Sequence, residues 1–249
     1  MPELSVLGWV LLALAAVVIG LSKAALPGAG TVAVALFAAV LPAKQSTGTI
    51  LLLLIVGDAF ALWAYRRDAD LRTLVRLIPA VAVGMLLGVV FLAYSDDDLV
   101  RRAIGVLLLA VVGFTLWRRR VAPAAASDGK PHRVAGAVYG GLGGFTTMVA
   151  NAAGPVMSMY FLSMRFPVLA FLGTSAWFFA VVNVSKIPFL IGLGMITPPG
   201  LLIVLVLIPL VVAGALVGRR IARRLPQRLF ERLVIALTVV GAVYLLLPV

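Results

Sequence analysis

The stretch Asn151-Ala152-Ala153-Gly154-Pro155 interrupts an apolar part of the chain, and Pro27-Gly28-Ala29-Gly30 interrupts the first half in a similar way. Each cluster opens a short apolar segment, residues 28–41 in the first half and 152–164 in the second. A helix of about 13 residues covers only about 20 Å, less than the ~30 Å of hydrocarbon in a bilayer. Proline and glycine end or kink a helix, and the freed backbone groups must then face protein or water. We therefore predict a half-helix in each half, entered through a break at membrane depth.

The composition of the whole chain places these breaks in a membrane. Of the 249 residues, 63% are hydrophobic and 12% are charged, whereas soluble chains average about 25% charged residues. The mean hydropathy is +1.16. A globular protein this apolar has too little polar surface to cover itself. The composition therefore predicts an all-α, polytopic integral membrane protein.

Ten apolar segments, five on each side of a polar connector, make up most of the chain. The connector spans residues 118–133 and has the Pro, Ser, Asp, Gly and Lys content of an exposed linker. We expect a first transmembrane repeat at residues 1–120, a linker at 121–133 and a second, inverted repeat at 134–249. The first segment follows no basic region and is not expected to be a cleavable signal peptide. Besides the two short segments, the apolar segments are residues 4–25, 46–65, 74–94, 99–117, 134–150, 169–194, 199–218 and 229–247.

The two halves repeat the same marker residues in the same order, with nearly constant spacing. Agreement of this kind indicates an internal duplication. The corresponding markers are Gly20-Leu21, Pro42, Gly48-Thr49, Asp58, Pro79, Gly84, Gly88 and Arg102 in the first half, and Gly141-Leu142, Pro167, Gly173-Thr174, Asn183, Pro209, Gly214, Gly218 and Arg232 in the second.

The positions of the charges predict the orientation in the membrane. Arginines cluster after the third, fifth and ninth segments, whereas Asp96-Asp97-Asp98 follows the fourth. Cytoplasmic loops carry the excess of Lys and Arg, so we expect both termini outside and the central linker in the cytoplasm of a bacterial-type inner membrane. Each half then has an odd number of crossings, and the repeats are inverted. The arginine clusters include Arg66, Arg67, Arg72, Arg76, Arg118–Arg120, Arg219, Arg220, Arg223, Arg224 and Arg228.

An inverted duplication with a broken helix in each half is the architecture of secondary transporters. The net charge of +12 lies in connectors between apolar runs, a placement that argues against nucleic-acid binding. No cysteine is present, and the sole histidine, His132, lies in the linker. The chain therefore lacks the residues of a membrane-embedded enzyme or a metal site, and we expect no cofactor. A passive channel remains an alternative.

The second half resembles the sulfite exporter TauE/SafE family, also called the toluene-sulfonate uptake permease family. The similar residues are a glycine-rich run, Gly140-Gly141-Leu142-Gly143-Gly144-Phe145-Thr146-Thr147, then the break at 151–155, then Gly173-Thr174-Ser175. In the first half Gly48-Thr49-Ile50 takes the place of Gly-Thr-Ser, and the resemblance covers about residues 5–247. Gly20-Leu21-Ser22-Lys23-Ala24 departs from the consecutive glycines usual in the family, which leaves the chemistry of the first half's site open.

The resemblance implies a secondary transporter, expected to be an exporter, of a small anion such as sulfite or an organosulfonate. A permease for a small carboxylate is the alternative within this class. The expected partners are a small anionic substrate, the lipid bilayer and a coupling ion, for which the proton is a candidate.

Two half-helix starts supply a physical basis for an anion site. A helix N-terminus presents unpaired N–H groups and about half a positive charge, and glycine allows these groups to approach a ligand closely. Tight helix packing is the alternative reason for small residues in a membrane, and it applies equally well to Gly84, Gly88, Gly214 and Gly218. The candidate binding residues are Lys23, Gly28, Gly30, Thr31, Thr49, Asn151, Gly154, Thr174, Ser175 and Lys186.

Ionisable side chains inside membrane segments are costly and therefore indicate function. Lys23 and Lys186 are candidates to pair with an anion, although Lys23 has the alternative of extending to the cytoplasmic face. Asp58 and Asn183, at corresponding positions, are the coupling candidates. Asp58 alternatively pairs with Lys186 or caps an interrupted helix. Trp177 either lines the pathway or fills the core.

Overall fold

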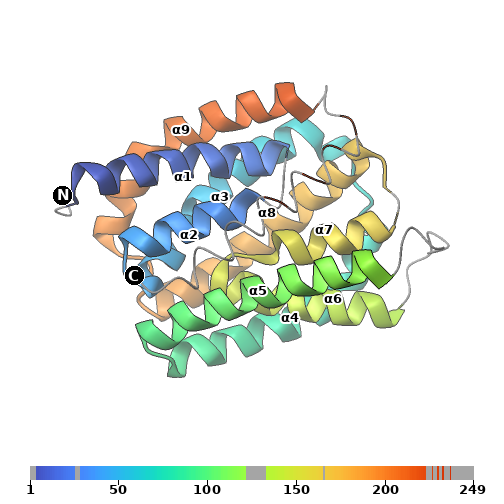
Figure 1. Cartoon of the computed structure of the whole chain (residues 1–249), viewed down its shortest axis with the longest axis horizontal. Helices are drawn as coiled ribbons and strands as arrows, with labels where there is room; N and C mark the ends of the chain where they lie inside the picture. Colours follow the sequence, from blue (N-terminus) through green and yellow to red (C-terminus); the bar gives the residue numbers. More distant parts are fainter. Residues whose placement is uncertain are drawn as a thin grey trace.

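The computed structural model describes residues 4–25, 29–121, 133–164 and 166–222, with positions 226, 229, 232 and 236. Three predicted features lie outside these residues: Gly28, most of the linker with His132, and nearly all of the tenth apolar segment. Every regular element in the described part is a helix (Figure 1). The elements are α1 Val6–Ala24, α2 Gly30–Val40, α3 Ala43–Tyr65, the 3-10 turn η2 Arg66–Asp68, α4 Leu71–Tyr94, α5 Asp97–Val121, α6 Arg133–Ala150, α7 Ala153–Ser163, α8 Val168–Gly192 and α9 Pro198–Ala222.

Five of these helices are long and apolar enough to cross a membrane, namely α1, α3, α4, α8 and α9. The prediction of an all-helical membrane protein is confirmed. By contrast, α2 and α7 have 11 residues each, so each extends only about 16 Å. They follow the two breaks, where the sequence predicts short helices.

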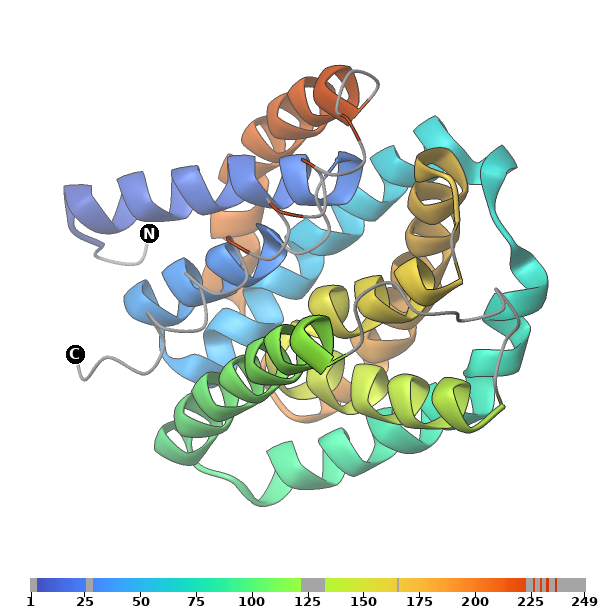
Figure 2. The ribbon, with the colours of Figure 1, turned by 45° about the vertical axis from the view of Figure 1, so that its right-hand side comes forward.

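The first helix of each half packs against a helix of the other half. α1 packs against α9 and crosses it, and α6 lies along α4 (Figure 2). Both crossings bring backbones together at glycine. A Cβ added to Gly20 would lie 1.9 Å from the Val211 carbonyl oxygen, and one added to Gly84 would lie 2.0 Å from the Gly141 carbonyl oxygen. Small residues therefore set the separation of these helices.

The remaining marker glycines follow the same pattern. A Cβ on Gly214 would lie 2.2 Å from the Val17 carbonyl oxygen, and one on Gly88 would lie 2.6 Å from the side chain of Met148. A Cβ on Gly218 would lie 3.1 Å from the Leu21 carbonyl oxygen. Of the two readings of these glycines, tight packing is the one that agrees with their positions.

Two clusters of buried side chains form the core, and each draws on both halves of the sequence. One centres on α1, α2, α3 and α9, with Leu12, Phe37, Leu53 and Val211, and extends to Leu92 of α4 and Ile104 of α5. The other joins α4, α6, α7 and α8 and includes Leu77, Tyr139, Met157, Phe161 and Phe171. The packed units of the molecule therefore differ from the two halves of the sequence.

α3 and α8 are the most buried of the long helices. Of their most apolar windows 56% is buried, against 33% for α4 and 39% for α1 and α9. The start of each helix packs on the end of the other: a Cβ on Gly48 would lie 2.0 Å from the Met195 carbonyl oxygen, and one on Gly173 would lie 2.6 Å from that of Tyr65. This antiparallel pair places Asp58 and Asn183 inside the molecule.

Candidate functional site

A small polar cavity lies where the starts of α2 and α7 meet α1, α3 and α8. Its volume is about 30 Å³, far below the roughly 300–1,000 Å³ of pockets for drug-sized molecules. Among the described candidate residues, eight line the cavity. They are Lys23, Gly30, Thr31, Asp58, Asn151, Gly154, Ser175 and Asn183.

The break in the second half depends on Asn151. Its φ is +50°, a left-handed conformation that asparagine adopts more readily than most residues. The N–H of Asn151 donates to the Thr147 carbonyl oxygen at 3.0 Å, which ends α6, and α7 begins two residues later. The side-chain nitrogen Nδ2 of Asn151 donates to the Thr47 carbonyl oxygen at 3.0 Å. Asn151 therefore turns the chain and ties the break to α3.

The break in the first half is fixed from both sides. The N–H of Ala25 donates to the Leu21 carbonyl oxygen at 2.9 Å, and the Tyr65 hydroxyl of α3 donates to the Ala24 carbonyl oxygen at 2.9 Å. This contact satisfies one of the carbonyl groups that a helix end leaves unpaired. A Cβ added to Gly30 would lie 3.1 Å from the Ser22 hydroxyl oxygen. The start of α2 therefore lies close against the end of α1.

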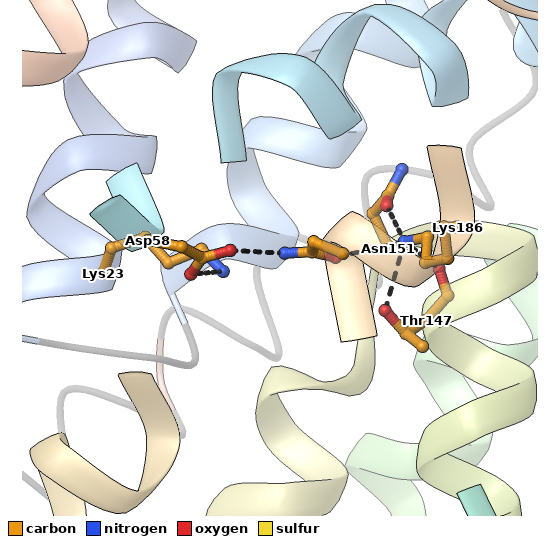
Figure 3. Close-up of polar contacts among 6 residues, drawn as sticks. Lys23, Asp58, Thr147, Asn151 and Lys186 are labelled. Atoms are coloured by element: carbon orange, nitrogen blue, oxygen red, sulfur yellow. Dashed lines mark hydrogen bonds and ion pairs between the residues drawn. The ribbon is translucent and has the colours of Figure 1, made fainter. Parts of the chain in front are cut away.

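A continuous series of polar contacts crosses the site, which we call the polar chain (Figure 3). Lys23 Nζ of α1 lies 2.7 Å from Asp58 Oδ1 of α3, and Asn183 Nδ2 of α8 donates to Asp58 Oδ2 at 2.7 Å. Lys186 Nζ, one turn further on α8, donates to Asn183 Oδ1 at 3.3 Å and to the Thr147 carbonyl oxygen at 2.8 Å. It also donates to Asn151 Oδ1. The polar chain thereby connects the two breaks through α3 and α8.

The two lysines have different surroundings. Lys186 is fully buried, and its three N–H bonds face four acceptors, the fourth being the Thr147 hydroxyl at 3.3 Å. Lys186 does not line the cavity and acts on it through Asn151 and Asn183. It therefore holds the second break in place.

Lys23 faces the cavity and pairs with Asp58 rather than extending to a membrane surface. Its side chain is 9% exposed, and Nζ lies 4.2 Å from the centre of the Phe179 ring. A Cβ on Gly57 would lie 2.9 Å from the Lys23 stem, so glycine at this position makes room for the lysine. Of the alternatives for Asp58, an ion pair is observed, with Lys23 in place of Lys186.

Thr49 and Thr174 do not line the cavity, although the sequence analysis includes both among the candidate binding residues. The Thr174 hydroxyl accepts the N–H of Asp70, at the start of α4, at 2.9 Å. Thr49 lies at the corresponding place in the other half: its hydroxyl oxygen is 2.7 Å from a Cβ added to Gly200, at the start of α9. In both halves the Gly-Thr motif therefore lies beside the start of another long helix, and in the second half it is bonded to that start.

Trp177 lines neither the cavity nor the deep core. It borders an apolar groove of about 230 Å³ between α4 and α8, and its Nε1 donates to the Arg66 carbonyl oxygen at 3.3 Å.

Ser22, Thr147 and Phe179 also line the cavity, although none of them is among the residues predicted from the sequence. Spacing is the signal that could have found two of them. Thr147 precedes Asn151 by four residues and Phe179 precedes Asn183 by four, so each pair shares a helix face. Ser22 is adjacent to Lys23.

The charges of the site favour a negative ligand. Lys23 places its amine at the cavity beside the Asp58 carboxylate. The starts of α2 and α7 add partial positive charge. In a medium of low dielectric constant, groups of this kind attract an anion strongly.

Among known proteins, no similar curated protein and no similar solved structure was found. The profile described as "Sulfite exporter TauE/SafE" matches residues 12–245, a range that includes both breaks and the whole polar chain. The chain belongs to the sulfite exporter TauE/SafE family of membrane transporters.

Proposed function

We propose that the chain is a secondary transporter that exports a small anion, sulfite or an organosulfonate, by alternating access around the cavity. One observation carries the proposal: two short helices begin at the same polar cavity, beside the buried Lys23 side chain. Family membership supports an anion of the sulfite or sulfonate type. The substrate is held by Lys23, by the backbone N–H groups at Gly30 and Gly154, and by Thr31 and Ser175.

The size of the cavity supports a substrate of few atoms. At about 30 Å³, the cavity is far smaller than a pocket for a drug-sized molecule. Sulfite or a short organosulfonate therefore needs only a modest expansion of the site, whereas a large aromatic sulfonate needs the surrounding helices to separate.

Inverted repeats provide the proposed route between the two faces of the membrane. The crossings of α1 with α9 and of α6 with α4 support this relationship, because both depend on glycines at corresponding positions. The two mixed cores then rock against each other, and the breaks absorb the change in direction. In this proposal both termini lie outside, and the protein resides in an inner membrane.

Transport is tested with purified protein in liposomes. We expect saturable efflux of sulfite that is accelerated by sulfite on the opposite side, since alternating access permits exchange. Flux proportional to concentration and without such acceleration would instead indicate a channel. A panel of sulfite, sulfoacetate, taurine, thiosulfate and short carboxylates defines the substrate class. A preference for carboxylates would contradict the sulfite assignment.

The site is tested by filling it. Gly30→Leu and Gly154→Leu place side chains at the two helix starts, so each should lower flux by roughly tenfold or more because the anion loses its N–H contacts. Gly192→Leu is the matched control, because Gly192 is exposed and a Cβ there meets no atom within 4 Å. All three variants should insert into the membrane. Normal flux in both cavity variants would contradict the site.

A further inference from the structure

Asp58 places a carboxylate beside the lysine that faces the cavity. It is 1% exposed, lines the cavity and lies 2.7 Å from Lys23 Nζ. A transported anion that binds Lys23 must therefore share this ammonium group with Asp58 or replace it. The geometry makes the substrate and the carboxylate competitors for one charge.

Lys186 does not provide an alternative partner for the anion. Its N–H bonds are already engaged by Thr147, Asn151 and Asn183, and it does not line the cavity. Lys23 has the Asp58 carboxylate and the Phe179 ring as partners. Of the two lysines, Lys23 is therefore the one that exchanges its anionic partner without opening the second break.

We propose that the Asp58 carboxylate is a built-in counter-anion that the substrate displaces from Lys23, so that each monovalent anion moves together with one proton carried on Asp58. This inference rests on the proposed transport function and deepens it. In the balanced step, Asp58 takes one proton from water on the side of entry, Lys23 keeps its protons, and the anion takes the place of the ionised carboxylate. On the other side the anion leaves and Asp58 releases the proton, so net export is driven by an outward gradient of the anion.

The charge of the site is the physical reason for this stoichiometry. In the empty site the Lys23 ammonium group faces the Asp58 carboxylate. In the loaded site it faces a neutral carboxylic acid and one substrate charge. The net charge of the site is the same in both states, so the membrane interior never has to accommodate an additional charge. In the described part of the chain, the charged groups that act on Asp58 are Lys23 from α1 and Lys186 from α8.

A pH gradient and a membrane potential separate this mechanism from others. Methanesulfonate is the probe, because it carries one negative charge across the accessible pH range and takes up no proton itself. In liposomes containing the wild-type protein, an inward methanesulfonate gradient should carry protons inward at about one per anion, reported by an internal pH dye. A pH gradient should drive accumulation, and a potassium diffusion potential imposed with valinomycin should leave the flux unchanged, because the combined movement is neutral.

Asp58→Asn keeps the shape of the side chain and removes its ability to carry a proton. The variant should retain exchange of methanesulfonate, lose proton movement by roughly tenfold or more, and acquire a dependence on the membrane potential. Asp98→Asn is the matched control, since Asp98 is exposed at the start of α5, and it should behave as the wild type.

The possible results separate the two proposals. Methanesulfonate or sulfite flux in the wild type without proton movement overturns this inference and leaves the transport function intact. Retention of pH-driven accumulation by Asp58→Asn also overturns it. If Asp58→Asn is not recovered as folded protein, the number of protons that move with each methanesulfonate ion in the wild type decides between the outcomes. Absence of flux of every anion tested contradicts the proposed function and this inference with it.

Discussion

Lys186 and Lys23 show how two residues of the same type take different parts in one site. Lys186 holds the second break with hydrogen bonds to Thr147, Asn151 and Asn183, whereas Lys23 forms an ion pair at the cavity. A lysine without a carboxylate partner is costly to bury, and these hydrogen bonds offset part of the cost. The site therefore combines a lysine with a fixed structural role and a lysine whose anionic partner is exchangeable.

Replacing Lys186 by methionine should destabilise the protein while keeping the length of the side chain. The variant leaves buried oxygen acceptors around the break without a donor, at a cost of about 1–3 kcal/mol for each unsatisfied group. We expect a clearly lower melting temperature in detergent, measured by tryptophan fluorescence. Lys44→Met, at a partly exposed lysine on α3, is the control. An unchanged melting temperature for Lys186→Met would contradict the holding role.

At the scale of single residues, the sequence predicts which side chains belong to the site better than it predicts their hydrogen-bond and ion-pair partners. Burial of Lys23, Asp58 and Lys186 follows from their position in apolar segments. The choice of Lys23 as the partner of Asp58 depends on the crossing of α1 and α3 and on the space left by Gly57. Thr49 and Thr174 are polar residues in a repeated motif, but their contacts with Gly200 and Asp70 arise from helices far away in the sequence.

The helices are set at their crossings by glycine, and this can be tested at one pair. Gly84→Ala places a methyl group 2.0 Å from the Gly141 carbonyl oxygen, so α4 and α6 must separate. Overpacking of this kind typically costs 1–3 kcal/mol, and we expect a lower melting temperature and less folded protein by size-exclusion chromatography.

Gly113→Ala is the control for this helix crossing. Gly113 is exposed on α5, and an added Cβ meets no atom within 4 Å. Because alanine has the higher helix propensity, this variant should be at least as stable as the wild type. Equal stability of Gly84→Ala and Gly113→Ala would show that close backbone contact does not stabilise the crossing.

Hydropathy predicts the helices themselves but places the starts of α3, α4 and α5 late. The apolar segment spans residues 74–94, whereas α4 begins at Leu71 and is capped by Asp70, whose Oδ1 accepts the Thr73 N–H at 3.2 Å. α5 likewise begins at Asp97 rather than at residue 99. Polar residues start helices because their side chains satisfy free N–H groups, and an apolar window excludes them.

The orientation of the whole molecule is a prediction from charge that labelling can test. α4 has 24 residues, about 36 Å of helix, so the exposed residues Arg67 before it and Asp98 after it lie on opposite sides of a membrane. The chain contains no cysteine, and single cysteines can therefore be read without background. In intact cells, Asp98→Cys should react with an impermeant maleimide, and Arg67→Cys should react only after permeabilisation. The reverse pattern would invert the proposed topology.

The arrangement of the helices is harder to predict than their positions along the sequence. Repeated markers indicate a duplication, but they do not reveal that α1 packs on α9 and α6 on α4. Such pairings depend on surfaces that complement each other only after the chain has folded. The two mixed cores therefore emerge from the structure alone.

The pairing of α1 with α9 affects how the protein folds in the membrane during translation. α1 leaves the ribosome long before residues 198–222 of α9 exist, yet its backbone finally rests on that helix at Gly20. During this delay the nascent α1 carries Lys23 into the bilayer without its final neighbour. Asp58 is synthesised well before α9 and offers the lysine a partner early. The ion pair therefore allows the first helix to remain in the lipid until translation supplies the helix that encloses it.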